Sequence, residues 1–430
     1  MKTIKNLTIF LGIMLYLLLA GILFYYDFLP LEQRLFFLGV ALILNLLLMI
    51  GVANLRRMGA VVTFLMLFLV MFAEGGGSYL VWSSMETLSS VSVNDPAGRV
   101  NAANGAHDEL APFHIFLSGK DTYGPLETES RSDVNMILTV NPRAHRIEIT
   151  TIPRDSYMRI AGEGYDEYDK LTHAGIYGVS ASVETLENFF DIDIQYYAEV
   201  NFSSLVELVD LLGGIDLYNP EYFTTAKYEF DEGNLHLDGA HALSFARERK
   251  HLRAGELGRG QNHVRIIKAI IDKAMSPAIL TSYPSILQVI SDKVRTNMPQ
   301  QSMVTLINYQ LAHNESWETT SSQLKGFETN GLPSFQIPDM ELYMFVPSRA
   351  SRRNLLDIMQ AVAEDAERPE SSETYELMPE DYADLPVSDF GDYLQNDTDQ
   401  ERYYSLQEME DDGAWMDDEP DEWVYQDNEE

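Results

Sequence analysis

Charged side chains gather at the ends of two short apolar segments in the first half of the chain. Residues 134–140 and 147–152 alternate apolar and polar side chains around a turn at Asn141–Pro142, which is typical of two neighbouring β-strands. The charged residues at their ends and in the preceding loop are Asp121, Arg131, Asp133, Arg154 and Asp155. Because guanidinium groups match phosphate oxygens and paired carboxylates suit Mg²⁺, the cluster predicts a site that holds a phosphate group and a metal ion together. A surface network of salt bridges is the alternative interpretation.

A second group of cationic residues lies further along the chain. In the sequence Arg247-Glu248-Arg249 the two arginines are separated by one residue, so in an extended segment both side chains lie on the same side. Two guanidinium groups placed in this way can bind one diphosphate. The alternative is a solvated basic turn, because further basic residues follow directly at Lys250 and Arg253.

Strands and helices alternate through the region that must position these side chains. Apolar alternation predicts strands at 113–117, 134–140, 147–152, 196–200 and 215–218. Helical periodicity predicts two helices between 283 and 313, and others at 177–190, 203–212, 240–245, 261–275 and 351–363. Ser203 is a suitable N-cap, and a Gly- and Asp-rich loop is expected at 162–169. We expect an α/β domain in which helices cover both faces of a central mixed sheet (α/β/α).

Three long apolar runs precede this domain. They span residues 7–26, 35–52 and 59–82, and each is close to the ~20 residues with which a helix crosses a bilayer. Basic residues flank the start of the first run and the segment between the second and third, at Lys2, Lys5, Arg56 and Arg57. The positive-inside rule therefore puts the N-terminus in the cytoplasm and everything after Trp82 outside. We expect a multi-pass protein of the cell membrane with an extracellular domain.

Glu74, which is followed by three glycines, interrupts the third run. A carboxylate inside hydrocarbon is energetically costly and can mark a functional position. We instead expect the embedded part of this helix to end near Ala73, with residues 75–82 in the outer interface.

Composition sets the domain limits and excludes some functions. A membrane anchor is expected at 1–84, a flexible Ser-, Asn-, Gly- and Ala-rich linker at 85–111, and the α/β domain at 112–366. The tail, 367–430, is expected to be disordered: residues 364–430 hold 26 acidic and 2 basic residues, and so carry 24 of the 36 net negative charges. So acidic a chain is unsuited to nucleic acid, and the absence of cysteine excludes disulfides and thiolate metal sites.

Several separated motifs occur in a fixed order: GKDTYGPL, SRSDVN, TTIPRDSY, DKLTHAGIYG, LVDLLGGIDLYN, LDGAHALSFARER and RGQN. Together they resemble the LytR–CpsA–Psr family, and most of all its members from streptococcal capsule loci. The similarity runs from about residue 113 to 275 and continues more weakly to about 365. It implies a membrane-anchored phosphotransferase that moves a glycopolymer, of the capsular polysaccharide or teichoic acid type, from a polyprenyl-diphosphate carrier onto peptidoglycan. A diphosphatase activity would fit the same site.

The resemblance also assigns roles to individual residues. Asp121 is a candidate general base, and Asp155 would orient Arg154. Mg²⁺, or Mn²⁺ in its place, would be held by Asp121 and Asp133. The diphosphate would lie among the arginines Arg131, Arg154, Arg247 and Arg249. Further substrate contacts would come from Lys170, Arg259 and Gln261. A peptidoglycan hydroxyl would attack the sugar-linked phosphorus, with polyprenyl phosphate as the leaving group.

One departure from the family leaves alternatives open. Members commonly have a second arginine where this chain has Gln261, and Gln cannot supply charge. A non-catalytic scaffold that binds the glycan or the lipid diphosphate is therefore an alternative, whereas a transcriptional regulator would need a basic cytoplasmic surface. The lipid would need an apolar slot, and the candidates for its lining are Leu186, Phe189, Leu205 and Val209. The alternative is that these four are ordinary core residues.

Overall fold

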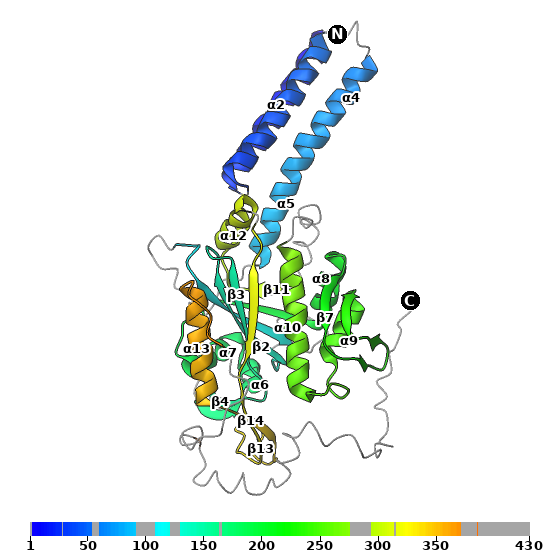
Figure 1. Ribbon diagram of the computed structural model, residues 1–430. Helices are drawn as coiled ribbons and strands as arrows, with labels where there is room; N and C mark the ends of the chain where they lie inside the picture. The colour runs from blue at the N-terminus through cyan, green and yellow to red at the C-terminus, as the bar shows by residue number, and fades with distance from the viewer. Residues whose placement is uncertain are drawn as a thin grey trace. The chain divides into compact units, whose positions relative to one another are not determined.

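A six-stranded sheet with the order β11-β6-β1-β2-β3-β12 forms the centre of the domain (Figure 1). The computed structural model describes residues 2–27, 29–53, 60–91, 108–120, 130–162, 166–275, 294–313, 315–370 and 385. The sheet strands are β1 (Phe113–Lys120), β2 (Val134–Asn141), β3 (Arg146–Thr151), β6 (Tyr196–Asn201), β11 (Val294–Thr296) and β12 (Glu318–Gln323). The β1–β6 and β3–β12 pairs are parallel, whereas the other three pairs are antiparallel. The mixed sheet expected from the sequence is confirmed.

Helices cover both faces of this sheet (Figure 1). Adjacent residues of a strand point to opposite faces, so Phe116 packs in one core and Leu117 in another. On the Phe116 side the core includes side chains from α7 (Val179–Phe190) and α13 (Arg349–Ala363). On the Leu117 side it includes side chains from α10 (Gly255–Ala274) and α12 (Gln300–His313). The α/β/α arrangement follows from these two apolar layers.

A third core lies beside the sheet. It is formed by α8 (Phe202–Leu211), α9 (Gly239–Arg247), β7 (Ile215–Asn219) and β10 (Gly233–Leu237). A Cβ atom on Gly239 would lie 2.2 Å from the Val206 carbonyl oxygen, so glycine is needed where α9 approaches α8. Leu205 and Val209 belong to this core, whereas Leu186 and Phe189 pack in the core under α7. These four residues therefore do not line one lipid slot.

Several element boundaries differ from the prediction. The expected loop at 162–169 contains β5 (Glu167–Lys170), which pairs with β4 (Tyr157–Ile160), and residues 294–296 are a strand rather than part of a helix. Asn201, rather than Ser203, caps α8, because its side chain accepts a hydrogen bond from the Ser204 N–H at 2.8 Å. Short polar strands show little apolar alternation, so they escape a periodicity search. The remaining elements are α6 (Leu171–Ala174), η2 (Gly175–Tyr177), β8 (Phe223–Thr224), β9 (Glu229–Phe230), β13 (Gly326–Asn330) and β14 (Tyr343–Pro347).

Three N-terminal helical segments are long and apolar enough to cross a membrane: Lys5–Tyr25, Leu31–Ala53 and Phe64–Ser83. The third segment continues as a helix through Glu74, which is buried and accepts a hydrogen bond from the side-chain amide of Asn45. That its membrane-embedded part ends near Ala73 stays a prediction. The elements are α1 (Lys2–Tyr25), α2 (Leu31–Ala53), α4 (Ala60–Val70), the π-helical η1 (Met71–Gly75) and α5 (Gly76–Val91).

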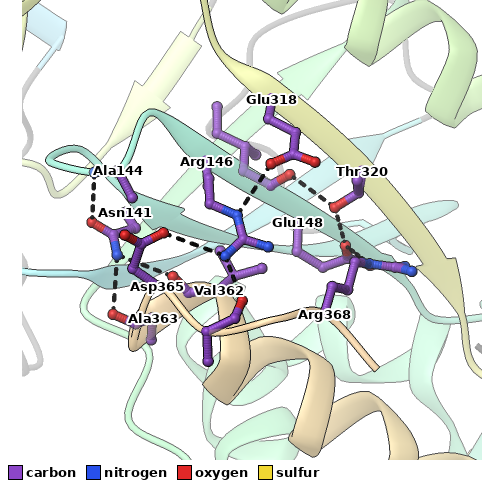
Figure 2. Close-up of polar contacts among 12 residues, drawn as sticks. Asn141, Ala144, Arg146, Glu148, Glu318, Thr320, Val362, Ala363, Asp365 and Arg368 are labelled. Carbon is purple, nitrogen blue, oxygen red and sulfur yellow. Dashed lines mark hydrogen bonds and ion pairs between the residues drawn. The ribbon is translucent and has the colours of Figure 1, made fainter. Parts of the chain in front are cut away.

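Two features lie just beyond the predicted limits of the anchor and of the domain. Helix α5 continues to Val91, so the first part of the predicted linker is helical. At the other end, Arg368 of the predicted tail forms an ion pair with Glu148 of β3 (Figure 2). Most of the linker and the tail, and residues 276–293 with part of the two predicted helices, lie outside the described residues.

Candidate active site

The candidate site lies where β2 begins and β3 ends. Because these strands are antiparallel, the start of one and the end of the other meet at the same edge of the sheet. Backbone hydrogen bonds continue this arrangement beyond the strands. The Asp133 N–H donates to the Gly119 carbonyl at 2.9 Å, and the Ile152 N–H donates to the Asn135 carbonyl at 2.9 Å. The residues that follow β3 are thereby held beside Asp133.

Four charged side chains form a continuous chain of ion pairs at this edge. Arg154 Nη1 lies 2.6 Å from Asp133 Oδ1, and Arg154 Nε lies 3.4 Å from Asp155 Oδ2. Lys170 Nζ donates a hydrogen bond to Asp155 Oδ1 at 2.7 Å. The side chains are between 12% and 27% exposed, so they are shielded but still reachable by a ligand. The alternating order Asp133–Arg154–Asp155–Lys170 fixes the orientation of the Arg154 guanidinium.

Lys170 reaches this chain because of the β4–β5 hairpin. Tyr157 of β4 pairs with Lys170 of β5, which places the end of β5 next to the turn that contains Asp155. The Thr172 N–H then donates to the Arg154 carbonyl at 2.8 Å. Three separate stretches of sequence therefore meet in one cluster: the start of β2, the turn after β3, and the end of β5.

Arg247 and Arg249 do not lie on one extended segment, contrary to the prediction. Arg247 is the last residue of α9, and Glu248 follows with an extended backbone. The Glu248 carboxylate accepts hydrogen bonds from the Arg249 N–H at 2.8 Å and the His251 N–H at 3.0 Å, which forms a tight turn. As a result Arg247 is half-buried and Arg249 is exposed. The two-residue spacing therefore does not by itself place the two guanidiniums on the same side of the chain.

His263 of α10 connects this turn with the ion-pair chain. Its imidazole is 9% exposed and hydrogen-bonded to the backbone of Ala246, the residue before Arg247. Burial lowers the pKa of His263 to about 3, and the positive charges of Arg259 and Arg154 lower it further. The ring is therefore neutral at physiological pH. His263 brings the end of α9, Arg259 and Arg154 into one site.

The ring nitrogens of His263 have different surroundings. Nε2 is buried and has no hydrogen-bond partner among the described residues, so the bond to Ala246 is made by Nδ1. Because a carbonyl can only accept, Nδ1 carries the proton and Nε2 carries the free lone pair. An unpartnered acceptor beside two guanidiniums is costly unless a ligand supplies the missing donor.

Sequence reasoning did not single out His263, although a signal was present. His263 lies four residues after Arg259, and residues with this spacing share one face of a helix. Gln261, where the resemblance predicts a second arginine, is exposed. The buried face of α10 thus presents Arg259 and His263, and the missing arginine lies away from it.

The remaining predicted residues are less closely defined. Asp121 falls in the segment 121–129, outside the described residues. Arg131 is exposed, and its neighbour Ser132 donates its N–H to the Thr172 carbonyl at 3.3 Å. A Cβ atom on Gly175 would lie 2.6 Å from the Ser130 carbonyl oxygen, so this segment packs closely against η2.

A metal ion at this site would have few protein ligands. In the part of the chain that the structure describes, no three acidic or histidine side chains converge on one point. Asp133 Oδ1 is paired with Arg154, and the donor set is oxygen only, which suits a hard divalent cation. Mg²⁺ is commonly held by one or two carboxylates together with substrate phosphates and water, so the residues present fit this ion when a diphosphate is bound.

The fold and the site define a class of protein with an apolar helical anchor and an α/β/α domain that carries a cluster of arginine, lysine and aspartate. The chain belongs to the LytR_cpsA_psr family, whose model matches residues 79–347. This match covers the whole central sheet and every described residue of the cluster.

Three relatives illustrate the similarity. The chain is 38% identical over 237 residues to the polyisoprenyl-teichoic acid–peptidoglycan teichoic acid transferase TagU of Bacillus mycoides, a match that covers 53% of this chain and 76% of the relative. It is 30% identical over 290 residues to the protein of the same name from Enterococcus faecalis, covering 67% and 94%. The crystal structure of B. subtilis TagV superposes with a TM-score of 0.50 at 26% identity, over 59% of this chain and 98% of that one.

Proposed function

We propose that this protein is a membrane-anchored phosphotransferase that moves a glycopolymer from a polyprenyl-diphosphate carrier onto peptidoglycan. The observation that supports it most directly is the Asp133–Arg154–Asp155–Lys170 chain, which orients a guanidinium beside a second group of basic residues. The two TagU relatives are named as teichoic acid transferases. The glycopolymer is of the teichoic acid or capsular polysaccharide type.

The transfer exchanges one phosphorus–oxygen bond for another. A peptidoglycan hydroxyl oxygen attacks the sugar-linked phosphorus, a new phosphodiester bond forms, and the bond to the departing polyprenyl phosphate breaks. Such reactions depend mainly on positioning and on neutralising the charge of the phosphoryl oxygens. Arg154, held by two carboxylates, binds these oxygens without reorganising, and Lys170, Arg247 and Arg259 surround the diphosphate.

The proton of the attacking hydroxyl requires an acceptor. Asp121 is the candidate from sequence. Mg²⁺, or Mn²⁺, bound through Asp121 and Asp133 would supply additional charge neutralisation at the diphosphate. A diphosphatase reaction follows from the same arrangement when water replaces the peptidoglycan hydroxyl.

The domain faces the outside of the cell in this proposal. Support comes from the three apolar helices and from the basic residues Lys2, Lys5, Arg56 and Arg57 at their cytoplasmic ends. Protease added to intact, wall-stripped cells should digest the chain after Trp82. Protection of the domain would contradict both this topology and the wall transferase.

The activity is tested with the full-length protein in detergent. A polyprenyl-diphosphate-linked glycan, peptidoglycan and Mg²⁺ are supplied, and released polyprenyl phosphate and wall-bound glycan are measured together. We expect both products in equal amounts. Binding of the lipid diphosphate without release would favour the non-catalytic scaffold, and loss of one particular polymer from the wall of a deletion strain would identify the glycopolymer.

A further inference from the structure

A cavity of about 660 Å³ lies between β4, α7 and the start of α13. It is separate from the candidate active site, because the described residues that line it include none of that cluster. Four arginines contribute to its wall: Arg159 from β4, and Arg349, Arg352 and Arg353 from α13. Its volume is within the range of about 300–1,000 Å³ that is typical of small-molecule sites.

The arginines of α13 are placed where cations are unfavourable. They lie in the first turns of the helix, at the positive end of its dipole, and directly after the N-cap Ser348. Burial lowers the pKa of Arg352, and the charges of Arg349 and Arg353 lower it further, against the opposing effect of Asp191. Like charges collected at a helix N-terminus are best offset by a bound anion.

The guanidinium of Arg352 is oriented for contact with a bound anion. Its guanidinium carbon lies 5.5 Å from the centre of the Phe189 ring, which fixes the plane of the group. Its Nε is buried and has no hydrogen-bond partner among the described residues. Arg159, on the opposite wall, pairs with Asp166 at 2.7 Å. The cavity wall therefore includes a guanidinium whose orientation is fixed by an aromatic ring.

Aromatic side chains line the same cavity. The rings of Tyr157 and Tyr168 lie 5.4 Å apart, and Phe189 contributes a third ring. Tyr157 is 2% exposed and its hydroxyl donates to the Pro333 carbonyl at 2.8 Å, so the flat apolar surface comes from Tyr168 and Phe189. Rings beside guanidiniums suit a ligand that has both apolar faces and negative charges, as a sugar chain with phosphates has.

The β4–β5 hairpin links this cavity with the candidate active site. Asp155 of the ion-pair chain lies two residues before Tyr157 of the cavity, and Lys170 pairs with Tyr157 across the hairpin. The hairpin continues to the Arg159–Tyr168 pair, so the distance from Asp155 to Arg159 is roughly 13 Å at the ~3.3 Å rise of a strand residue. A glycan attached to a diphosphate at Arg154 can extend along the β4–β5 hairpin to the cavity.

We propose that this cavity binds the anionic glycan chain of the donor, a few sugars beyond the diphosphate. The inference rests on the proposed function and adds a second subsite to it, with phosphate groups at the arginines and sugar rings on the aromatic residues. Leu385 also lines the cavity, so the acidic segment that precedes it is the competing occupant considered in the test.

The test uses the full-length protein in detergent with the triple substitution R349Q/R352Q/R353Q. Two donors are compared: a lipid diphosphate that carries one uncharged disaccharide, and one that carries a chain of phosphodiester-linked sugars. We expect kcat/KM for the charged chain to fall roughly 10–100-fold, mainly through KM, with less than about a twofold change for the short donor. A charge-matched control, R143Q/K227Q/K268Q, removes three exposed cations elsewhere and should leave both values unchanged.

Equal losses on both donors, or none on either, would overturn the proposal. A thermal melt of each variant shows whether the substitutions disturb the fold, and R352Q alone serves if the triple variant unfolds. Binding of a phosphodiester-linked glycan without lipid diphosphate is measured separately by equilibrium dialysis. If the wild type binds this glycan but transfers nothing, the proposed function fails while the subsite stands.

The competing occupant is tested with a chain that ends after Glu370. A peptide with the sequence of residues 371–386 is added to this truncated protein, with and without the triple substitution. If the peptide binds only when the arginines are present, and the triple substitution leaves glycan affinity unchanged, the cavity serves the acidic segment and the proposal is wrong.

Discussion

The β2–β3 hairpin carries two networks of arginine and carboxylate that differ in how completely they are satisfied. One is the Asp133–Arg154–Asp155–Lys170 chain of the candidate active site. The other, which we call the C-terminal latch, consists of Asn141, Arg146, Glu148 and Arg368 and is shown in Figure 2. Both combine arginine with carboxylates, and both include residues on or directly next to β2 and β3.

In the latch every carboxylate oxygen of Glu148 has a partner. Glu148 is 0% exposed, and Arg368 donates to it through Nε at 3.1 Å and Nη2 at 3.2 Å, while the Thr320 hydroxyl donates to the same group. Arg368 Nη2 donates further to Ser322 Oγ at 2.7 Å. These contacts hold the segment that follows α13 against the sheet.

The rest of the latch binds the end of α13 itself. Asn141 Nδ2 donates to the carbonyls of Val362 and Ala363, each at 3.0 Å, so it satisfies carbonyls of the last helical turn (Figure 2). Arg146 Nη1 donates to the Ala366 carbonyl at 2.7 Å. The latch is thus a closed structural network.

The candidate site differs in both respects. Its carboxylates keep 12–19% of their surface, whereas Glu148 keeps none, although the arginines of the two networks are similarly exposed. The neighbouring His263 Nε2 lacks a partner among the described residues. Residue type therefore does not separate a structural network from a functional one. The solvent access of the carboxylates does separate them, because an accessible carboxylate leaves interactions for a ligand.

The largest effect should come from breaking the latch with Arg368→Ala. Removal of one partner leaves Glu148 buried without compensation, so we expect the free energy of unfolding to fall by about 3–5 kcal/mol. Turnover of the protein that stays folded should be unchanged. Chemical denaturation measures the loss, with Arg143→Ala as the control, since that exposed arginine pairs with Asp108 and should contribute less than about 1 kcal/mol. A loss below 1 kcal/mol in the Arg368 variant would remove the distinction between the two networks.

Substitutions in the candidate site should lower turnover rather than the stability of the fold. Arg154→Ala, Arg247→Ala and Arg249→Ala should each lower turnover roughly 10–150-fold, since a charge-assisted phosphate contact contributes about 1.5–3 kcal/mol. Their melting temperatures should stay close to the wild type. Lysine at these positions should restore only part of the rate, because it lacks the planar fork. Unchanged rates for the Arg247 and Arg249 variants would support the alternative interpretation of this segment as a solvated basic turn.

His263 should make folding sensitive to acid. Its pKa is near 3 in the folded protein and near 6.5 when unfolded, so below pH 6.5 the unfolded state binds the additional proton and stability falls until about pH 3. Between pH 7 and 5 the wild type should lose about 2 kcal/mol more than His263→Gln. His114, whose pKa burial lowers to about 4, adds its own loss to both proteins. Parallel stability curves would show that the ring is not buried as described.

The metal proposal is tested by EDTA and by Asp121→Asn and Asp133→Asn. EDTA should abolish transfer and Mg²⁺ should restore it. Each substitution should lower the rate at least roughly tenfold and weaken the response to Mg²⁺, with little change in melting temperature. The contact between Asp133 and Arg154 allows a different role, in which the aspartates only orient arginines. Variants that are slower but keep the wild-type Mg²⁺ dependence would support that role and refute the metal site.

Removal of the acidic tail should have the smallest effect. A chain that ends after Glu370 keeps Arg368 and the latch, and the deleted segment has a composition that does not build a packed site. Turnover on a short donor should stay within about twofold of the full-length protein. A tenfold loss would show that the tail contributes to the site.

Much of the fold could be predicted because its signals are local. The alternation at 134–140 and 147–152 predicts β2 and β3, and the helical period predicts α7, α8 and α13 within a few residues. The strands β5, β11 and β12 were missed because they are largely polar, and β4 was missed because it has only four residues. In the site, Arg154 and Asp155 were found from their position after a strand. His263 was overlooked because its sequence signal is only its spacing of four residues from Arg259 on one helix.

The sequence by itself determined the three apolar segments long enough to cross a membrane, the strands and helices with clear periodicity, and the residue types available for phosphate chemistry. These depend on neighbours along the chain, whose side chains lie on one face or in one apolar run. Only the tertiary structure decided which charges meet: Arg368 contacts Glu148 across 220 positions of sequence, and Arg154 contacts Asp133 rather than Glu148. An arginine has the same chemistry everywhere, so its role follows from the partners, burial and solvent access that folding gives it.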